Sequence, residues 1–474
     1  MVAKGHSSAG RVDLTTISFH RSPRMALSNL PLTAARWFLL ANIVLAAWLY
    51  GGTREWAREW VTWLLLANTG LFILGLLAQG RPPRISWVAA AAVAFLLLQG
   101  WFMTWNANHL FLDAARVFVD RPQQPMPGWP GFMDVAMIVP QMLLTTGLLG
   151  AFCIACDLTA NRVWRDRLWH TLAGTGLSLV LLGLVQRLTE APSIFWDVER
   201  NLGATFFAVF RYHANAGTFL NLVMPLMAGL AVRAFARPGA ERERVFWTLA
   251  SATTAAAGFV NVSRAANVIC VLLLLGIAAW IAARRMRATH SHRLSTGLAI
   301  ATLIAATTAL LAYSFGMEKT LARWEIGVRK GTSFATGRHQ AGAIIIQSAL
   351  PASGAWGFGP GTFEPMFNIH RARAGSPLAG RWDKAHSDAL QTPMEWGWAG
   401  AGAWAVLLLG AMLRAVRSAW RGESDESKIL PTVCAFSLVG VLLHALADFP
   451  LQIPALQLFT LLIAGIAWSL PARA

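Results

Sequence analysis

Charged residues are scarce in this chain. Only 13% of its 474 residues are Asp, Glu, Lys or Arg, and 55% are hydrophobic, whereas roughly a quarter of the residues of a soluble globular protein are charged. This shortage excludes an ordinary soluble protein. It indicates an all-α membrane protein, a polytopic bundle of transmembrane helices.

Acidic residues are the scarcer kind of charge. Asp and Glu number 23 against 40 Lys and Arg, for a formal net charge of +17. In a soluble chain this excess would suggest a nucleic-acid ligand. Here the arginines cluster in short loops between apolar runs, as the orientation signals of membrane proteins do. We therefore expect no nucleic-acid partner.

Cysteine is rare as well. Cys153, Cys156, Cys270 and Cys434 all fall inside apolar runs, so no disulfide is expected in the loops. Cys153 and Cys156 have the CxxC spacing of redox motifs in soluble proteins. Within a membrane span we interpret them as small packing residues.

Apolar runs of about 20 residues, the length that crosses a bilayer, predict about twelve transmembrane helices. The runs lie near residues 37–52, 61–79, 86–105, 133–156, 169–186, 215–236, 246–263, 265–282, 296–315, 397–417, 431–447 and 455–470. The chain divides accordingly into an N-terminal tail (1–35), transmembrane helices 1–9 (36–315), one large loop (316–396) and transmembrane helices 10–12 (397–474). The tail is polar, so we expect a cytoplasmic extension rather than a signal peptide.

The loops differ between the two faces of the predicted bundle. Arginine-rich loops lie on the side of the N-terminal tail, which predicts that both termini are cytoplasmic. The opposite face carries the longer loops, near 106–132, 187–214 and 316–396. Because a structureless loop of about eighty residues is unusual, we expect helices within 316–396. The segment 338–350 is predicted to form one that ends at Pro351.

Groups that exchange protons gather at the end of that large loop, between Lys384 and Gly400. The run contains His386, and histidine is the residue type that exchanges protons near neutral pH. Asp388 follows two residues later, and Glu395 closes the polar run before the next apolar helix. We expect His386 to be able to exchange a proton at the membrane surface, with a loop anchor as the alternative role. Asp388 and Glu395 are candidate supporting groups, although Glu395 also fits the role of a helix cap.

Two arginines, Arg211 and Arg264, are predicted to lie at the level of this histidine. The apolar run from 246 to 282 is about twice as long as a bilayer is thick, so it must turn near its middle, and Arg264 lies at that turn. Arg211 precedes the sixth predicted span, and Arg338 opens the loop helix. Guanidinium groups donate paired hydrogen bonds to phosphate oxygens. We expect Arg211 and Arg264 to bind phosphate or pyrophosphate, with snorkelling to lipid or a structural role as alternatives.

Other polar features are assigned structural roles. The stretch Gly357–Phe363 lacks the strand and the helix of a dinucleotide loop and predicts a tight turn. His339 and His370 have no metal-ligand spacing with a partner, and we expect both on the surface. His444 and Asp448, four residues apart, are expected to close the outer end of the eleventh helix.

One pattern resembles the signature of the O-antigen ligase and polymerase superfamily, in which a His and a small polar residue precede a Gly-x-x-Gly. It consists of His386-Ser387 followed by Gly397 and Gly400, and Ala385–Gln391 is similar to the family's Ala-His-Asn-Asp-x-Leu-Gln form. Supporting matches follow in order along the C-terminal two thirds of the chain: Arg211 with Asn215, Arg264, Arg338 ahead of the glycine-rich turn, and His444–Ala455. The N-terminal third matches only in hydropathy.

The resemblance implies a bacterial inner-membrane enzyme whose active site is periplasmic. Such an enzyme takes a glycan from undecaprenyl pyrophosphate within the membrane lipids and moves it to an acceptor, without metal, cofactor or nucleotide sugar. His386 would be the catalytic base, and Arg211, Arg264 and Arg338 would bind pyrophosphate or substrate, with Asn215 in a supporting role. The sequence agrees in having no DxD motif and no carboxylate pair with metal-ligand character.

The sequence does not decide the identity of the acceptor. It is lipid A core in an O-antigen ligase, which the His-to-Gly spacing favours, another lipid-linked repeat in an O-antigen polymerase, or a protein hydroxyl in an O-oligosaccharyltransferase. A transporter or flippase would also have many helices, but it usually has ionisable groups at the bilayer midplane or inverted repeats. The predicted spans contain almost no Asp or Glu.

Overall fold

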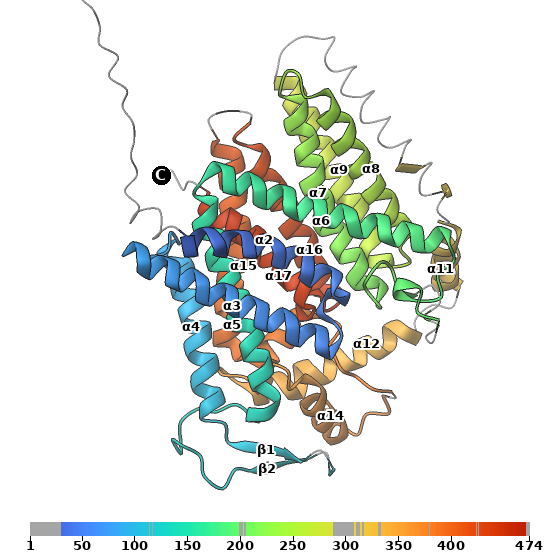
Figure 1. Ribbon diagram of the computed structural model, residues 1–474. Coiled ribbons are helices and arrows are strands. Elements are labelled where there is room, and N and C mark those ends of the chain that lie inside the picture. Colours follow the sequence, from blue (N-terminus) through green and yellow to red (C-terminus); the bar gives the residue numbers. More distant parts are fainter. Residues whose placement is uncertain are drawn as a thin grey trace, which may run out of the picture.

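The structure is a computed structural model that describes residues 30–470 apart from 113, 116, 199–201, 203–204, 288–307, 310–312, 315–316, 330–332, 379, 423 and 425. This part of the chain is mostly helical (Figure 1). The long helices are α2 (Leu30–Trp48), α3 (Glu55–Gln79), α4 (Trp87–Trp105), α5 (Val135–Thr159), α6 (Arg162–Leu188), α7 (His213–Phe235), α8 (Glu241–Val260), α9 (Arg264–Arg287), α15 (Asp388–Arg421), α16 (Ile429–Ala447) and α17 (Pro454–Ser469).

Nine of the helices in the described ranges are long and apolar enough to cross a membrane. They are α2 to α7, α9, α15 and α16, and α17 is apolar but shorter, with 16 residues. Each of them overlaps one of the apolar runs, as α8 does. The predicted span at 296–315 falls largely outside the described residues. Helices of this length and composition indicate a multi-pass membrane protein.

Helix α7 is enclosed by its neighbours α6, α8, α9 and α16. Of its span, 83% is buried, more than in any other candidate span of the described chain. It packs against α8 and α16, and Figure 1 shows α7, α8 and α9 side by side. Small residues permit this packing: a Cβ atom on Gly229 would lie 2.6 Å from Cγ1 of Val433 in α16. Close approach at glycines is the usual way in which membrane helices associate.

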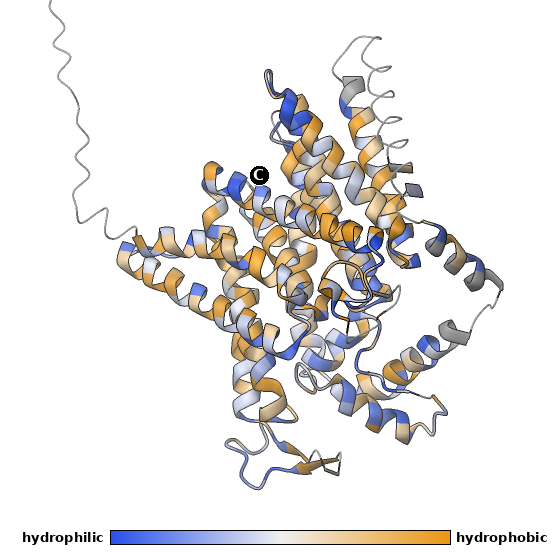
Figure 2. Cartoon of the chain, turned by 45° about the vertical axis from the view of Figure 1, so that its right-hand side comes forward, coloured by the Kyte–Doolittle hydropathy of each residue, from blue (hydrophilic) through white to orange (hydrophobic). Residues whose placement is uncertain are grey.

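The helices expose two polar ends. The site end carries the first residues of α7, α9, α15 and α17 and the last residues of α8 and α16. The arginine-rich end carries the opposite termini and is held by ion pairs such as Arg81 with Asp157 at 2.6 Å. Figure 2 shows hydrophobic residues along the long helices and hydrophilic ones gathered in loops and short helices at both ends.

The segment between α9 and α15 contains helices, as its length predicts. They are α11 (Glu318–Arg329), α12 (Ser333–Ile344), the π-helical turn η4 (Ile345–Ala349), α13 (Leu350–Ser353) and α14 (Phe363–Arg373). The prediction that a helix ends at Pro351 is wrong. Pro351 lies in the first turn of α13, where a missing amide breaks no helical hydrogen bond, and the wider π-helical turn precedes it.

His370 is buried, with 2% of its surface exposed, so its predicted place on the surface is wrong. It follows Phe367 by three residues in α14 and therefore lies on the same helix face, which packs into a local core. Its Nδ1 lies 2.8 Å from the hydroxyl of Ser348. His339, in contrast, is exposed as expected.

A small hairpin departs from the all-α expectation. Strand β1 (His109–Leu112) pairs antiparallel with β2 (Val117–Asp120), and His109 lies opposite Asp120. Strand β2 is rich in β-branched and aromatic side chains, which favour strands, and Phe111 of β1 lies opposite Phe118. The strands are too short to resemble a membrane span, and the sequence predicts only a loop here.

Two glycines let the loop cross α15 closely. The helix is interrupted at Gly397, whose φ is 67°, so residues 388–396 form a short helical segment before the long apolar part. Backbone hydrogen bonds join this region to 354–359: Gly359 N donates to the Glu395 carbonyl at 2.8 Å. A Cβ atom on Gly357 or Gly397 would collide with the backbone of the other segment. Both glycines therefore have a structural role.

Replacing Gly397 with alanine should destabilise the protein by about 1–3 kcal/mol, because alanine would have to adopt a positive φ and its Cβ would meet the carbonyl oxygen of Ala355. Gly402→Ala is the matched control, since no atom lies within 4 Å of a Cβ at that position of the same helix. Thermal unfolding of both variants in detergent measures the difference. Equal melting temperatures would contradict the proposed close crossing.

Candidate active site

His386 lies in the turn that leads into α15 at the site end. Its φ of 51° is in the left-handed region, which costs a non-glycine residue about 1–2 kcal/mol. Its neighbours Ala385 and Ser387 are buried, and Ala385 N donates to Gln391 Oε1 at 3.1 Å. The turn is thus held in place while the imidazole stays 21% exposed. Backbone strain of this kind concentrates at functional sites.

The imidazole contacts two residues that are distant in the sequence. His386 Nδ1 lies 3.1 Å from Asp448 Oδ1 and 3.2 Å from Arg338 Nη2. A carboxylate only accepts hydrogen bonds and a guanidinium only donates them, so Asp448 and Arg338 compete for Nδ1. Arg338 Nη2 also donates to the hydroxyl of Tyr212 at 3.1 Å, and Asp448 lies slightly closer to Nδ1, which favours the tautomer with the proton on Nδ1. Nε2 then keeps its lone pair and can accept a proton from a hydroxyl group.

Tyr212 completes a set that we call the His386 cluster: Tyr212, Arg338, His386 and Asp448. Its hydroxyl donates to Asp448 Oδ2 at 3.1 Å and accepts from Arg338 Nη2 at 3.1 Å. Arg338 also donates to the carbonyl of Ala447 at 3.0 Å and lies 3.6 Å from Asp448. Four segments, namely α12, the residues before α7, the turn before α15 and the end of α16, therefore meet at one point.

The protonation states fit these hydrogen bonds. Burial raises the pKa of Tyr212, and the charge of Asp448 raises it further, so the phenol stays protonated and donates. Burial alone would raise the pKa of Asp448. The hydrogen bond from His386 and the charge of Arg338 outweigh burial and hold the pKa of Asp448 below its ordinary value. Asp448 is therefore a carboxylate acceptor at neutral pH.

Aromatic rings enclose the imidazole. The ring of Phe449 lies 5.0 Å from that of His386 and the ring of Trp382 lies at 5.8 Å, both approaching edge-on. Tyr212 stacks on Phe449 with an interplanar angle of 1°. These contacts fix the orientation of the imidazole and leave flat apolar faces close to it.

Arg211 and Arg264 lie at the site end beside this cluster. Arg211 directly precedes Tyr212, and Arg264 is the first residue of α9; both are exposed. Their two turns are joined, since Asn261 Nδ2 donates to the His213 carbonyl at 2.8 Å. Within the described chain, neither guanidinium forms a hydrogen bond with the His386 cluster. The structure thus brings Arg338 into contact with His386 and leaves Arg211 and Arg264 exposed on neighbouring turns.

Asn215 lies one turn into α7 from the same end. It is buried, with 4% of its surface exposed, and its Oδ1 has no hydrogen-bond partner among the described residues. It makes no described contact with His386. A buried amide oxygen without a partner is unusual in a folded protein.

Asp388 and Glu395 are buried and occupied by structural hydrogen bonds. The Asp388 carboxylate accepts from Leu451 N at 2.8 Å and from Gln452 Nε2 at 2.9 Å, which fixes the turn before α17. Glu395 accepts from Gln391 Nε2 at 3.1 Å and from backbone amides at the start of α14. The carboxylate that contacts His386 is Asp448, and Glu395 caps α14 rather than the helix that follows it.

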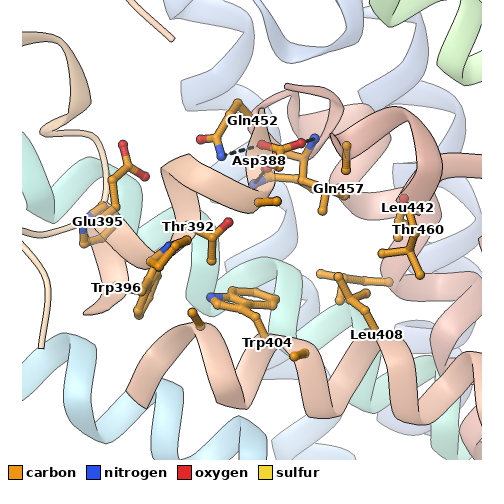
Figure 3. A pocket seen from close by; sticks show the side chains of 18 of the residues that line it. Asp388, Thr392, Glu395, Trp396, Trp404, Leu408, Leu442, Gln452, Gln457 and Thr460 are labelled. Atoms are coloured by element: carbon orange, nitrogen blue, oxygen red, sulfur yellow. Dashed lines mark hydrogen bonds between the residues drawn. The ribbon is translucent and has the colours of Figure 1, made fainter. Parts of the chain in front are cut away.

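A cavity of about 760 Å³, which we call the groove, runs between α15, α16, α17 and α5 (Figure 3). Its lining is apolar along the helices and polar near the His386 turn. The apolar side chains include Trp404, Leu408 and Leu442, and the polar ones include Lys384, Asp388 and Gln452. Leu446 and Trp398 on the lining are 62% and 59% exposed, so the groove opens toward the side of the bundle. His386 itself faces Asp448 rather than the groove.

Sequence reasoning missed two members of the His386 cluster. Tyr212 was passed over, although it is one of only three tyrosines and adjoins Arg211. Asp448 was assigned to closing a helix end, which is incomplete because it also contacts His386. An available signal was its position just beyond a long apolar run, where an acidic residue is costly without a partner.

No family model matches the chain, and no curated protein matches it.

Proposed function

We propose that this protein is a membrane glycosyltransferase of the O-antigen ligase type, which moves a glycan from a polyprenyl pyrophosphate to an acceptor hydroxyl. The observation that carries this proposal is the contact of His386 Nδ1 with Asp448 at 3.1 Å, with Arg338 alongside. It leaves Nε2 available as a base. The base lies at a polar end of the bundle, the depth at which the charged group of a membrane-anchored donor would lie.

The chemistry is a single displacement. His386 Nε2 takes the proton of the acceptor hydroxyl, and the hydroxyl oxygen attacks the anomeric carbon of the donor sugar. The bond from that carbon to the pyrophosphate oxygen breaks, and the pyrophosphate leaves with the electron pair, so the anomeric carbon inverts. Asp448 stabilises the imidazolium that forms. A positioned general base contributes typically about two to four powers of ten in rate.

The groove supports a lipid-linked donor. Its apolar lining along α15 and α16 and its opening at the exposed Leu446 suit a polyprenyl chain that enters from the membrane. Lys384 lies on the same lining, two residues before His386, and supplies a cation where the pyrophosphate would leave the groove. Apolar contact along such a chain contributes about 25 cal/mol per Å² of buried surface.

Arg264→Ala should lower the rate of transfer by about a hundredfold, because a guanidinium that stabilises the departing pyrophosphate acts mainly in the transition state. Arg264→Lys should recover little of that loss, since an ammonium lacks paired donors. Arg242→Ala, at an exposed position of the arginine-rich end, is the control and should keep the full rate. Initial rates with purified protein measure all three. Full activity in both Arg211→Ala and Arg264→Ala would remove the arginines from the mechanism.

The test of the whole proposal uses purified protein in detergent, where no compartments exist for a transporter to act across. One undecaprenyl-pyrophosphate-linked glycan is supplied with lipid A core, with a second lipid-linked repeat, or with a protein acceptor, and the products are sized on a gel. We expect a single transfer to lipid A core. A ladder without lipid A core would indicate a polymerase, and a product only on protein would indicate an O-oligosaccharyltransferase. No transfer in any arm would overturn the enzyme proposal.

A further inference from the structure

A second cavity lies at the arginine-rich end, opposite the His386 cluster and unused by the proposed reaction. It has a volume of about 810 Å³ and lies between the first turns of α6 and α16 and the last turns of α15. A cavity of this size is in the range of ligand sites. Its described lining includes six arginines against two carboxylates, Asp166 and Glu426.

Both carboxylates already pair with arginines of the lining. Arg233 lies 2.7 Å from Asp166, and Arg162 lies 3.1 Å from Glu426. Because the six arginines outnumber these two carboxylates, the described lining carries an excess of positive charge. Glu423 and Asp425 precede α16 in the sequence and lie outside the described residues.

Two arginines of the lining, Arg414 and Arg417, form no ion pair with a carboxylate among the described residues, and Arg165 shares the charge of Asp166 with Arg233. Arg165 Nε is buried without a described hydrogen bond. Arg414 donates from Nε at 3.0 Å and from Nη2 at 2.7 Å, but both bonds go to the carbonyl of Leu470. Arg417 follows one turn of α15 later and is exposed. These side chains come from two helices far apart in the sequence and converge on one cavity.

We propose that this cavity binds a phosphate-bearing anion through Arg165, Arg414 and Arg417, and that the anion is the headgroup of an acidic phospholipid. Guanidinium groups donate paired, charge-assisted hydrogen bonds to phosphate oxygens. The same cavity also has apolar side chains, among them Leu413 and Trp468. An acyl chain of a lipid can contact these side chains, whereas a free phosphate ion cannot use them. Basic pockets between helices at this depth suit anionic lipid headgroups.

The experiment uses the full chain, purified in detergent and stripped of lipid. Thermal unfolding is followed during titration with phosphatidylglycerol, with phosphatidylcholine of the same chain length, and with inorganic pyrophosphate. Native mass spectrometry counts bound lipids. The variants are Arg414→Gln and Arg417→Gln, singly and together, with Arg242→Gln as the matched arginine outside the cavity. Because Arg417 is exposed, Arg417→Gln tests the site even if Arg414→Gln fails to fold.

Phosphatidylglycerol alone should raise the melting temperature, and each cavity variant should weaken its apparent affinity about fivefold. Arg242→Gln should bind as the unaltered protein does. Equal shifts with phosphatidylglycerol and phosphatidylcholine, or equal affinities in the cavity variants, would overturn the proposal. A shift with pyrophosphate as large as that with phosphatidylglycerol would overturn the lipid as the source of the anion. Glycan transfer by Arg417→Gln should stay unchanged, so the outcome is separate from that of the proposed function.

Discussion

The variant His386→Asn is expected to transfer glycan about two to four powers of ten more slowly than the unaltered protein while it stays folded. Asparagine tolerates the left-handed backbone that residue 386 adopts, with φ 51°. Its amide can still donate a hydrogen bond to Asp448, but it has no basic nitrogen to take a proton from the acceptor. Initial transfer rates and thermal unfolding, both in detergent, measure the two effects.

His386→Ala separates proton transfer from architecture. It should be as inactive as the asparagine variant, but it should also unfold at a lower temperature. Alanine is strained at a positive φ, and Asp448, 5% exposed in its side chain, would lose a hydrogen-bond donor. An asparagine variant that keeps more than about a tenth of the rate would exclude His386 as the base.

The second large effect is expected at Asp448. Asp448→Asn should lower the rate by about a hundredfold or more, because the amide can donate to His386 Nδ1 and so favours the tautomer whose Nε2 carries the proton. An Nε2–H group cannot accept the proton of the acceptor hydroxyl. The replacement is nearly isosteric, so the fold should persist. The loss should appear in kcat, with the KM for the lipid-linked donor little changed, and steady-state kinetics measure this division.

Tyr212→Phe is the matched control for Asp448. It removes the hydroxyl that donates to Asp448 Oδ2 at 3.1 Å but leaves the contact between His386 and Asp448. We expect a loss smaller than about tenfold, in the range of one hydrogen bond between a neutral and a charged group. If the two variants lose the same fraction of the transfer rate, or if Asp448→Asn only raises KM, then Asp448 has a structural role alone.

Much of the helical architecture is predictable because the signal is local. A helix in a membrane satisfies its own backbone hydrogen bonds, so a run of apolar residues is sufficient to predict it. The turn expected near 261–264 is confirmed on the same grounds: α8 ends at Val260 and α9 begins at Arg264. The run there is too long for one crossing, and polar residues interrupt it.

The roles of two glycines could not be predicted from local sequence patterns. Gly357 and Gly397 belong to patterns that predict a tight turn and a family signature. Each glycine is required because the backbone of the other segment passes within contact distance. That crossing joins positions about forty residues apart. The spacing of the two glycines along the chain does not predict this contact. The same holds for His370, which the packing of α14 buries.

The sequence by itself determined that this chain is a helical membrane protein and where most of its spans lie, and it singled out the polar stretch that contains His386. Tertiary structure alone decided the partners of His386. The carboxylate at the imidazole is Asp448, 62 positions away, and Asp388, two positions away, is turned to the loop before α17. The physical reason is that a hydrogen bond depends on where helix ends meet. The packing of α15 against α16 sets that meeting point, and no spacing within either helix encodes it.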